Sequence, residues 1–358
     1  MRLALLLLAL AALAPTVGAQ TGVLVGTVRD ADGTPLPGAS VVLTGTARGA
    51  AVSAEGRFRI ERLAPGAYRV VASMVGYTSA VEPVRVAASD TAHVALTLAA
   101  TVAALGGAVV EAERDERWAR RLRQFLRALV GESGNADSTR LLNPEVLDFT
   151  SSWGTLSATA AAPLVFENRA LGYRLTYLLT DFEGGASSVR YDGEESFEEL
   201  APTSPEEAAR WAAARERAYR GSLSHLLRSL LAGTAEAEGF ALALVRQDAW
   251  GARPSFRASA GWVMAVDADG WGTLRIRDQL EVVYDGEPEE PAYLRSAWFR
   301  EPRSRPDPVQ RSSLFVDRGR ARIDPRGVPE DPFAVSVSGH LAFERLADRV
   351  PHGYMPTD

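Results

Sequence analysis

The sequence contains no cysteine and no lysine, and it has only four histidines. Without cysteine there can be no disulfide bond, no thiolate metal site, no thiol nucleophile and no lipid-modified cysteine. Without lysine there can be no Schiff-base lysine and no lysine in a phosphate-binding loop. All 39 basic residues are therefore arginine, which stays charged at any ordinary pH. The four imidazoles are His93, His225, His340 and His352. Few residues remain that could act in catalysis.

The length and the charge restrict the class of protein further. At roughly 100 to 200 residues per domain, 358 residues are enough for about two domains. The formal net charge is −6, whereas a general nucleic-acid binder has a basic surface. We therefore expect no nucleic-acid partner, and no motif in the chain predicts a cofactor or a metal ion.

Residues 1–19 have the pattern of a secretory signal peptide. An apolar run from Leu3 to Ala14 follows Arg2, and the small residue Ala19 precedes a cleavage point before Gln20. The run is too short to span a hydrocarbon layer of about 30 Å comfortably, and no later apolar run approaches that length. We expect an exported protein without a transmembrane helix after cleavage. It would be located in the periplasm, at the outer membrane or outside the cell.

Residues 20–100 consist of short alternating runs separated by turns. Two of these runs flank the turn at 54–56 and predict a hairpin. In the run after this turn, Phe58 and Ile60 fall on one face and the neighbouring arginines on the other. The segment contains about seven such runs with no helical periodicity between them, which is typical of a small β-sandwich.

The same segment carries an ordered pattern of glycine, proline and aromatic residues. The pattern consists of Gly26, Asp30, Gly33, Pro35, Leu36, Pro37, Gly38, Ala39, Gly56, Phe58, Ile60, Pro65, Gly66, Tyr68, Gly76 and Tyr77. It resembles the carboxypeptidase regulatory-like domain over nearly the whole segment. The resemblance implies a prealbumin-like β-sandwich, grouped by shape with carbohydrate-binding-like folds. It also implies an accessory module that has no catalytic residues of its own.

Neither usual companion of that domain follows it here. A metallocarboxypeptidase needs a His-x-x-Glu pair for zinc, but His340 meets its glutamate four positions later, at Glu344, and the other histidines lack one at three. A nutrient-receptor barrel needs many strands of about ten residues each, for which the rest of the chain is too short. The module is therefore attached to something else.

Residues 101–140 are predicted to form a linker and an arginine-rich amphipathic helix. The run at 109–112 is either a last strand or an extended linker. Between Glu113 and Gly131, apolar residues recur at helical spacing at Trp118, Leu122, Phe125, Leu126 and Leu129. The rest of the helix surface is occupied by Arg114, Arg117, Arg120, Arg121, Arg123 and Arg127. These arginines form either a contact for phospholipid or lipopolysaccharide phosphates or an ordinary solvated face, and we favour the solvated face.

Residues 141–358 are predicted to be a β-rich domain with a second amphipathic helix at about 204–232. Ser204 and Glu207 form a capping box, Gly221 can kink the helix, and Gly233 ends it. Strands are predicted at 163–167, 173–179, 240–246, 262–266, 273–277, 281–284, 294–299, 313–316, 321–323 and 334–337, with a short closing helix at 340–349. The fold class is thus mainly β with two amphipathic helices. It comprises an N-terminal seven-stranded β-sandwich and a larger antiparallel α+β domain.

The tetrapeptide Tyr-Asp-Gly-Glu occurs twice in this second domain, at 191–194 and at 284–287. Asp-Gly between strand-like flanks is a hairpin signal. The two copies therefore predict two hairpin turns, and they are compatible with an internal repeat.

Ser222 and His225 are the only pair that suggests nucleophilic catalysis. At a spacing of three residues on a helix they can touch, as a nucleophile and its base must. No acid is evident nearby to orient the imidazole, and no Gly-x-Ser-x-Gly turn surrounds the serine. A half-buried histidine beside a small serine at a packing contact explains the pair without catalysis.

Two aspartate-rich turns suggest other chemistry. Residues 30–33 and 267–270 resemble half of a calcium-binding loop, but neither has a glutamate at the twelfth position. Asp267 and Asp269 are also the paired carboxylates that a hydrolase would use. Tight turns are the simpler interpretation of both segments.

The sequence therefore favours a non-catalytic envelope or secreted protein that binds a glycan, a peptide or another envelope component. Two alternatives remain, namely a hydrolase with its site in residues 141–358 and an accessory subunit of an outer-membrane transporter. Sugar-stacking platforms would have to come from the tryptophans Trp153, Trp250, Trp262, Trp271 and Trp298. Most of these are expected to serve the core.

Overall fold

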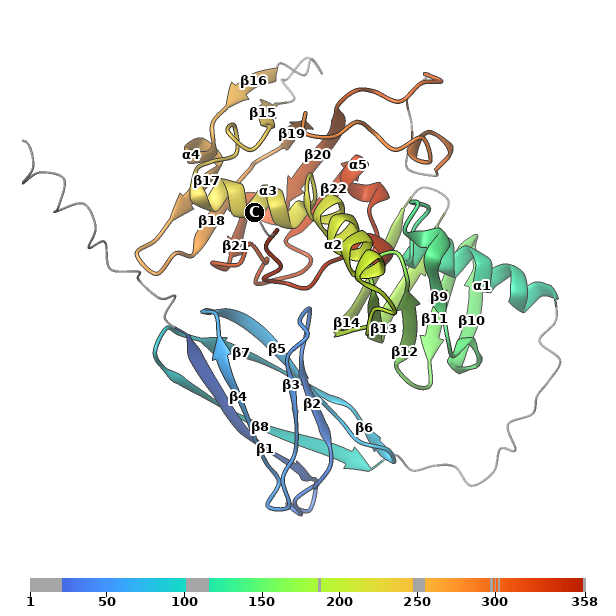
Figure 1. The fold of residues 1–358 in the computed structure, drawn as a ribbon, viewed down its shortest axis with the longest axis vertical. Helices are drawn as coiled ribbons and strands as arrows, with labels where there is room; N and C mark the ends of the chain where they lie inside the picture. The colour runs from blue at the N-terminus through green and yellow to red at the C-terminus, as the bar shows by residue number, and fades with distance from the viewer. Residues whose placement is uncertain are drawn as a thin grey trace, which may run out of the picture.

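The computed structural model describes residues 21–100, 116–185, 188–246, 255–296, 299, 301 and 303–356 (Figure 1). This part of the chain is mostly β, which confirms the predicted fold class. Its buried hydrophobic side chains form three separate cores. The predicted signal peptide at 1–19 and the strand or linker at 109–112 lie outside the described residues.

The N-terminal core lies inside a sandwich of two four-stranded sheets. The strands are β1 (Gly22–Asp30), β2 (Ser40–Leu43), β3 (Gly49–Ala51), β4 (Arg57–Leu63), β5 (Gly66–Ser73), β6 (Tyr77–Thr78), β7 (Ala80–Val86) and β8 (Thr91–Ala100). One sheet has the order β4-β1-β8-β6 and the other β3-β2-β5-β7. The sandwich has one strand more than predicted because the run at 78–86 divides into β6 and β7, which join opposite sheets.

The predicted hairpin around residues 54–56 is wrong, although the faces of its second strand are right. β3 pairs with β2, and β4 pairs with β1, so the turn crosses from one sheet to the other. Phe58 and Ile60 are buried in the core between the sheets, and Arg57 and Arg59 are exposed. Side-chain alternation identified the buried face but carried no information about which strand lies alongside.

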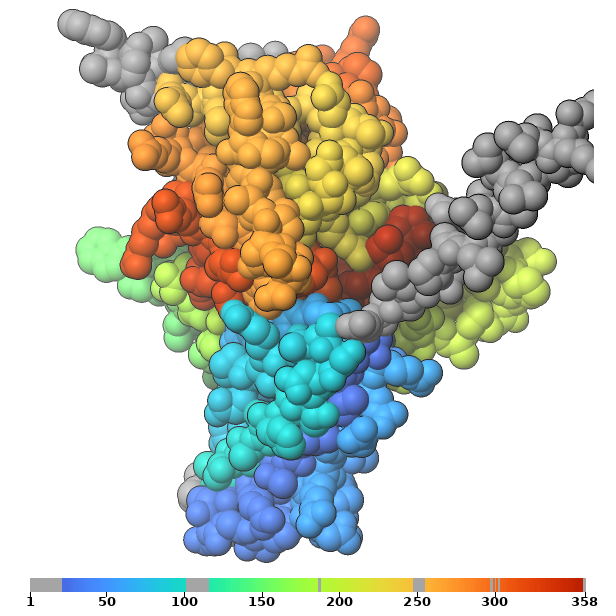
Figure 2. Space-filling model, turned by 90° about the vertical axis from the view of Figure 1, so that its left-hand side faces the viewer, coloured from blue at the N-terminus to red at the C-terminus, as the bar shows by residue number. Residues whose placement is uncertain are grey.

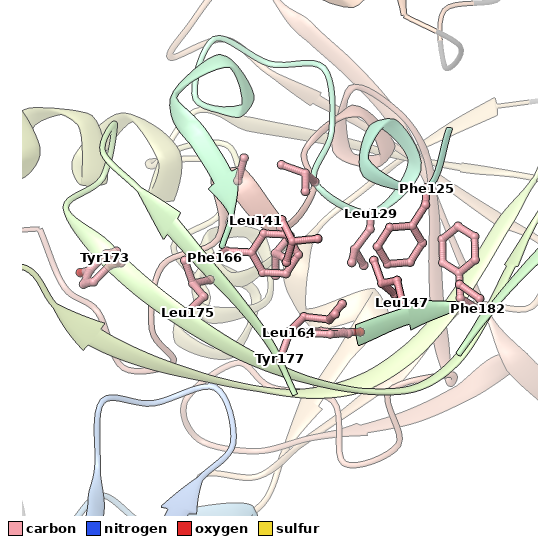
Figure 3. Close-up of a cluster of buried hydrophobic side chains, with 14 of the residues drawn as sticks. Phe125, Leu129, Leu141, Leu147, Leu164, Phe166, Tyr173, Leu175, Tyr177 and Phe182 are labelled. Carbon is pink, nitrogen blue, oxygen red and sulfur yellow. The ribbon is translucent and has the colours of Figure 1, made fainter. Parts of the chain in front are cut away.

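A second core is built mainly from one helix and a six-stranded antiparallel sheet, with Ala214, Ala218, Leu346 and Ala347 added from later segments. The elements are α1 (Glu116–Leu129), β9 (Thr139–Leu141), β10 (Leu147–Ser152), β11 (Thr155–Ala160), β12 (Leu164–Asn168), β13 (Tyr173–Gly184) and β14 (Val189–Glu199). The sheet order is β10-β11-β13-β12-β9, and β14 pairs along β13. α1 packs on one face of this sheet, where Phe125 meets the ring of Phe182 edge-on at 4.7 Å between centroids (Figure 3).

α1 also fastens the free edge of β10. The indole Nε1 of Trp118 donates to the carbonyl of Leu147 at 3.3 Å, and Arg121 donates to the carbonyl of Phe149 at 3.1 Å. Open edge strands invite pairing with other chains, and covering them is a common protection. The helix and the edge strand therefore form one unit. α1 lies within the predicted helix at 113–131, of which residues 113–115 are outside the described part.

The second predicted helix is two helices, α2 (Pro205–Tyr219) and α3 (Leu223–Ala232). Ser204 caps α2 by accepting from the amide of Glu207 at 3.2 Å, which is one half of the predicted capping box. The carboxylate of Glu207 accepts from the amide of Thr203 at 2.7 Å in place of that of Ser204. The chain breaks at Gly221, whose φ is +76°. A Cβ there would lie 2.6 Å from the side-chain oxygen of Gln310, so this position needs glycine for both its conformation and its space.

The third core follows α2. Its elements are β15 (Phe240–Val245), β16 (Ser255–Ala258), α4 (Ala260–Val263), β17 (Met264–Val266), β18 (Gly272–Arg275), β19 (Gln279–Tyr284), β20 (Gln310–Val316), β21 (Arg320–Ile323), β22 (Val335–Gly339) and α5 (His340–Phe343). One sheet has the order β16-β15-β19-β20-β22 and a smaller one β17-β18-β21. The predicted domain at 141–358 thus contains two cores. α1, which the sequence places in the 101–140 segment, belongs to the first of them.

Several predicted elements in residues 141–358 are wrong. The run at 262–266 begins inside the short helix α4, and 293–295 form a 3₁₀ turn in place of a strand. The closing helix at 340–349 is split into α5 and a 3₁₀ turn at 346–348. Short apolar runs do not distinguish a strand from a single helical turn.

Neither copy of Tyr-Asp-Gly-Glu makes a hairpin. Residues 191–194 lie in the middle of β14. Tyr284 is the last residue of β19, and 285–287 begin a long connection. Within β14, a Cβ on Gly193 would lie 2.6 Å from the ring of Tyr177. The glycine therefore serves close packing against an aromatic ring, and the prediction of a turn is wrong.

The sandwich is docked on the rest of the chain through the ends of its strands (Figure 2). Asp324 accepts from the guanidinium of Arg326 at 2.8 and 2.6 Å and from the amide of Ala67, in β5, at 3.2 Å. Arg326 also stacks over the ring of Tyr68, 3.8 Å from its centroid. Asp324 is fully buried and Arg326 nearly so. A buried ion pair thus joins the third core to the sandwich.

Main-chain hydrogen bonds continue this contact on the second core. The turn after β2 pairs with β14: Thr46 forms a parallel bridge with Ser196, and its carbonyl accepts from the amide of Phe197 at 3.0 Å. The amide of His352, near the C-terminus, donates to the carbonyl of Gly45 at 2.6 Å. A Cβ on Gly45 would lie 2.2 Å from the His352 ring. The sandwich is therefore a fixed part of the molecule.

Candidate functional site

The structure does not assemble Ser222 and His225 into a catalytic pair. Ser222 is the N-cap of α3: its Oγ accepts from the amide of His225 at 3.2 Å and donates to the carbonyl of Tyr219 at 2.7 Å. The imidazole is used elsewhere. Its Nδ1 accepts from the amide of Gly221 at 3.0 Å, and its Nε2 lies 2.9 Å from the carboxylate of Glu238. No imidazole nitrogen is left to accept a proton from the serine.

Glu238 is the orienting acid that the sequence did not reveal, because it comes from the turn before β15, thirteen residues after the histidine. Burial lowers the pKa of His225, against the opposing effect of Glu238. The ring is neutral at pH 7, packed against Phe240 and Tyr284. Through these contacts, His225 connects α3 to the segment after α2 and to the third core, and its role is structural.

We expect Ser222→Ala to lower the free energy of unfolding by about 1 kcal/mol, the usual cost of losing an N-cap. The expected result in hydrolase assays with ester and peptide substrates is no difference from the wild type. Chemical denaturation followed by circular dichroism measures the first effect. Ser151→Ala, in an exposed part of β10, is the matched control. A loss of hydrolysis in the Ser222 variant alone would contradict this structural interpretation.

Both aspartate-rich segments are turns. Asp30 accepts from the amides of Asp32 and Thr34 at 3.0 and 2.8 Å. Asp267 does the same with Asp269 and Trp271, at 3.1 and 2.9 Å. The first carboxylate of each segment is thus occupied by its own backbone. Among the residues that the structure describes, no group of three His, Asp or Glu side chains is arranged to hold a metal ion.

A further buried carboxylate, in the C-terminal 3₁₀ turn, packs against the segment that follows α1. Asp348 accepts from Ser133 at 2.7 Å and from Asn135 at 3.0 Å. Burial raises its pKa to about 6, against the opposing effect of these donors. The residue holds the C-terminal 3₁₀ turn against the segment after α1, and its role is structural.

The tryptophans predicted as sugar-stacking platforms differ in their exposure to solvent. Trp271 is buried, at 6% exposure, and Trp262 is exposed. Trp153 is completely exposed, at 102%, whereas Trp250 and Trp298 lie outside the described residues. A completely solvated indole presents a large, rigid apolar face to water and to any ligand that stacks on it.

Trp153 sits at the tip of the hairpin between β10 and β11, where Ser152 faces Thr155. The two turn residues, Trp153 and Gly154, have φ values of +50° and +81°. Hairpins of this kind normally carry Asn-Gly or Asp-Gly, because a left-handed conformation strains other residues. The strain costs of order 1–3 kcal/mol. The turn at this tip thus combines a strained backbone with a fully solvated indole.

Hydroxyl side chains line the hairpin behind the tryptophan. Cross-strand pairs join Thr150 to Ser157 and Ser152 to Thr155, and Thr159 continues the row opposite Asp148. These positions alternate with Leu147, Phe149, Leu156 and Ala158, which are buried beneath α1. We call Thr150, Ser152, Thr155, Ser157 and Thr159 the hydroxyl face. It lies on the side of the sheet opposite α1.

The hydroxyl face continues into charged residues on the next two strands. Ser157 is paired with Glu183 of β13, which in turn faces Arg190 of β14. Arg190 forms an ion pair with Asp181 at 3.1 Å. Hydroxyls, carboxylates and a guanidinium thus lie side by side on an exposed sheet that ends in an indole. The sequence analysis missed this site, although the alternation of hydroxyl and apolar residues from 147 to 160 was the available signal.

The backbone of the sandwich fits the glycine pattern of its sequence. Gly33 and Gly56 have φ values of +83° and +75°. A Cβ on Gly26 would lie 2.6 Å from the ring of Phe58. Residues 23–99 match the family profile described as the carboxypeptidase regulatory-like domain. This segment is a carboxypeptidase regulatory-like domain.

Two glycines of the regulatory-like domain serve the interface with the rest of the chain. Gly45 admits the ring of His352, and a Cβ on Gly66 would lie 2.6 Å from both Asp324 and Arg326. Other pattern residues act within the domain: Leu36 and Ala39 are buried in its core. The domain thus contributes a docking surface for the rest of the chain.

Solved structures resemble the chain only weakly. The minor pilin GBS52 of Streptococcus agalactiae is 21% identical over 23% of this chain and 45% of its own, with a TM-score of 0.20. A cohesin-X-dockerin complex of Acetivibrio cellulolyticus is 20% identical over 24% of this chain and 63% of its own, with a TM-score of 0.21. The Bacillus anthracis TIE protein is 13% identical over 51% of this chain and 31% of its own, also with a TM-score of 0.21.

The chain spans less than two thirds of the length of each of these structures. No curated protein matches its sequence. In the described part of the chain, no helix has the length and apolarity needed to cross a membrane.

Proposed function

We propose that this is a non-catalytic, exported protein of the cell envelope that binds a glycan on the hydroxyl face, with Trp153 as the stacking residue. The signal-peptide pattern at 1–19 supports export, to the periplasm, the outer membrane or the exterior. The regulatory-like domain supports an accessory role. The observation that carries the proposal is the completely exposed Trp153 in a left-handed turn at the end of a row of hydroxyls.

The chemistry of this face suits a carbohydrate. A sugar ring presents one apolar face of C–H groups, which stacks on an indole, and a rim of hydroxyls that need donors and acceptors. Serine and threonine hydroxyls supply both roles, and Glu183 adds a strong acceptor. The residues of this face are exposed or half-buried, so it fits a stretch of polymer better than a small molecule enclosed in a pocket.

Catalysis has less support. The hydroxyl of Ser222 is a helix cap, the imidazole of His225 is held by Glu238, and Asp267 is held by its own turn and by Arg322, at 3.2 Å. The hydrolase alternative would therefore need a site built from other residues. The transporter alternative rests only on where regulatory-like domains occur, and it predicts co-purification of a barrel protein from the native envelope.

The proposal is tested by affinity electrophoresis of residues 20–358 in gels containing peptidoglycan fragments, cellulose derivatives, xylan or a bacterial exopolysaccharide. We expect retardation by at least one polymer. Trp153→Ala should weaken that binding about tenfold, the loss of roughly 1.4 kcal/mol of stacking. It should leave the free energy of unfolding almost unchanged, because the indole is fully exposed and alanine carries the same strain in a left-handed turn.

Trp262→Ala, which removes another exposed indole, is the matched control and should bind as the wild type does. Thr150→Val and Ser157→Ala test the hydroxyls separately from the indole. Retardation that is equal in the wild type and in the Trp153 variant would overturn the assignment of the site. No retardation by any polymer would overturn the proposed function.

A further inference from the structure

The outward side of α1 carries a row of exposed arginines. Arg117, Arg120, Arg123 and Arg127 recur at spacings of three, three and four residues, so they follow one side of the helix. We call them the arginine stripe. At 1.5 Å per residue the stripe is about 15 Å long. The opposite side of the helix carries the buried Phe125 and Leu129.

Most of the stripe lacks the ion pairs that hold arginines elsewhere. Arg303 is clamped by Glu289 at 2.7 Å, and Arg349 pairs with Glu195 at 2.9 Å. Arg117, Arg120 and Arg123 take part in none of the ion pairs formed within the described part of the chain, and all are exposed. Arg127 pairs with Glu132. The only acidic residue of α1 is Glu116, in its first turn.

The stripe is also held rigidly. Phe125 and Leu129 anchor α1 in the second core, and Trp118 and Arg121 bond it to the edge of β10. Arg117, Arg120 and Arg123, which have no ion-pair partner among the described residues, are thus presented on an anchored helix, which costs little further backbone ordering when a partner binds.

We infer that the arginine stripe is a docking surface for a membrane rich in anionic phospholipid. Guanidinium groups bind phosphate in a bidentate manner and stay charged at any ordinary pH. A straight row on a convex helix meets a planar array of headgroups along its whole length. The net charge of −6 repels any anionic partner at long range, so the stripe has to act by short-range contact. A flat array of headgroups meets the whole row at once, and a nucleic-acid duplex is an outcome that the test distinguishes.

This inference is independent of the proposed function, because the stripe and the hydroxyl face lie on opposite sides of the same sheet. The experiment is co-sedimentation of residues 20–358 with vesicles of phosphatidylcholine alone or with 30% phosphatidylglycerol as the probe, where the vesicle compositions are design values of roughly physiological charge density. We expect binding only to the anionic vesicles, and its loss at high salt.

The decisive variant combines Arg117→Gln, Arg120→Gln and Arg123→Gln. It should bind anionic vesicles about 100-fold more weakly, since each arginine near an anionic membrane contributes about a factor of five. The matched control combines Arg59→Gln, Arg257→Gln and Arg318→Gln, which removes the same charge from exposed positions elsewhere. The control should keep its affinity, and both variants should keep the wild-type circular dichroism spectrum.

Three outcomes would overturn the inference. The first is no binding of the wild type to anionic vesicles, and the second is an equal loss in the two triple variants. The third is tighter binding to a 20-base-pair DNA duplex, a probe about two helical turns long, than to the vesicles. If glycan binding fails while vesicle binding depends on the stripe, only the proposed function is lost. The reverse result would overturn only the inference about the stripe.

Discussion

Replacing Asp324 with alanine is expected to lower the free energy of unfolding by about 3–5 kcal/mol, because it leaves a buried guanidinium without a counter-ion. Asp324 has no exposed surface, and Arg326 is 7% exposed. The same carboxylate accepts from the backbone amides of Val328 and Ala67 at 3.0 and 3.2 Å. Their loss adds unsatisfied buried donors. Guanidinium denaturation followed by tryptophan fluorescence measures the effect.

Because the ion pair joins the sandwich to the third core, the variant should also unfold in two steps, with the sandwich separating from the rest of the chain. Asp317→Ala is the control. Asp317 pairs with Arg318 at 3.5 Å on an exposed surface, and its loss should cost less than about 0.5 kcal/mol. If the two alanine variants were equally stable, the interface would not contribute the stability that its burial implies.

Acidification is expected to destabilise the protein through His340, and His340→Phe should remove this part of the pH dependence. The ring is 3% exposed and lies among Tyr293 and Phe343, with centroids 5.3 and 5.5 Å away. Burial lowers the pKa of His340 to about 4, against an unfolded value of 6.5. Its Nε2 has no hydrogen-bond partner within the described part of the chain, so a phenyl ring sacrifices no bond there.

The sign of this pH dependence follows from the protonation of His340 in the folded and in the unfolded chain. Between pH 6.5 and about 4 the unfolded chain protonates this histidine and the folded chain does not. Stability is therefore fully present above pH 6.5 and falls as the pH decreases towards 4. The total loss is about 3 kcal/mol, at 1.36 kcal/mol per pKa unit.

The measurement is the difference in unfolding free energy between the His340 variant and the wild type at pH 7.5, 6, 5 and 4, a range chosen to bracket the two pKa values. Groups common to both proteins, such as Asp348, contribute equally and cancel. The difference should grow in favour of the variant as the pH falls. His93→Phe, at an exposed position of β8, should give a curve parallel to the wild type. A constant difference for His340→Phe would refute the assignment.

The sandwich was readily predicted because its signals are local. Turn glycines such as Gly33 and the alternation around Phe58 depend on residues close in sequence, and each survived in the structure. Strand partners are a different matter. β3 and β4 are separated by a tight turn and still enter opposite sheets, because the choice depends on which surfaces remain to be buried once all the strands are present.

The candidate sites likewise combine features that local sequence predicts with features that only the tertiary fold determines. The spacing of Ser222 and His225 placed them near each other correctly, but it could not show that Glu238 and the amide of Gly221 occupy both imidazole nitrogens. Those partners come from the tertiary fold and from a helix break. Conversely, the exposure of Trp153 could not be foreseen, since an indole is usually buried. In the structure Trp153 lies in a left-handed turn and is exposed, whereas Trp271 is buried.

The attachment of α1 to one face of the β10–β11 hairpin, with hydroxyls on the other, has a geometric consequence. A molecule held to a membrane by the arginine stripe would turn its hydroxyl face away from the lipid, towards whatever polymer lies above. The membrane contact and the glycan contact would then lie on opposite sides of a single sheet. Binding at either surface would raise the effective concentration of the other, so that two modest affinities would make the protein a cross-link between a bilayer and a glycan layer.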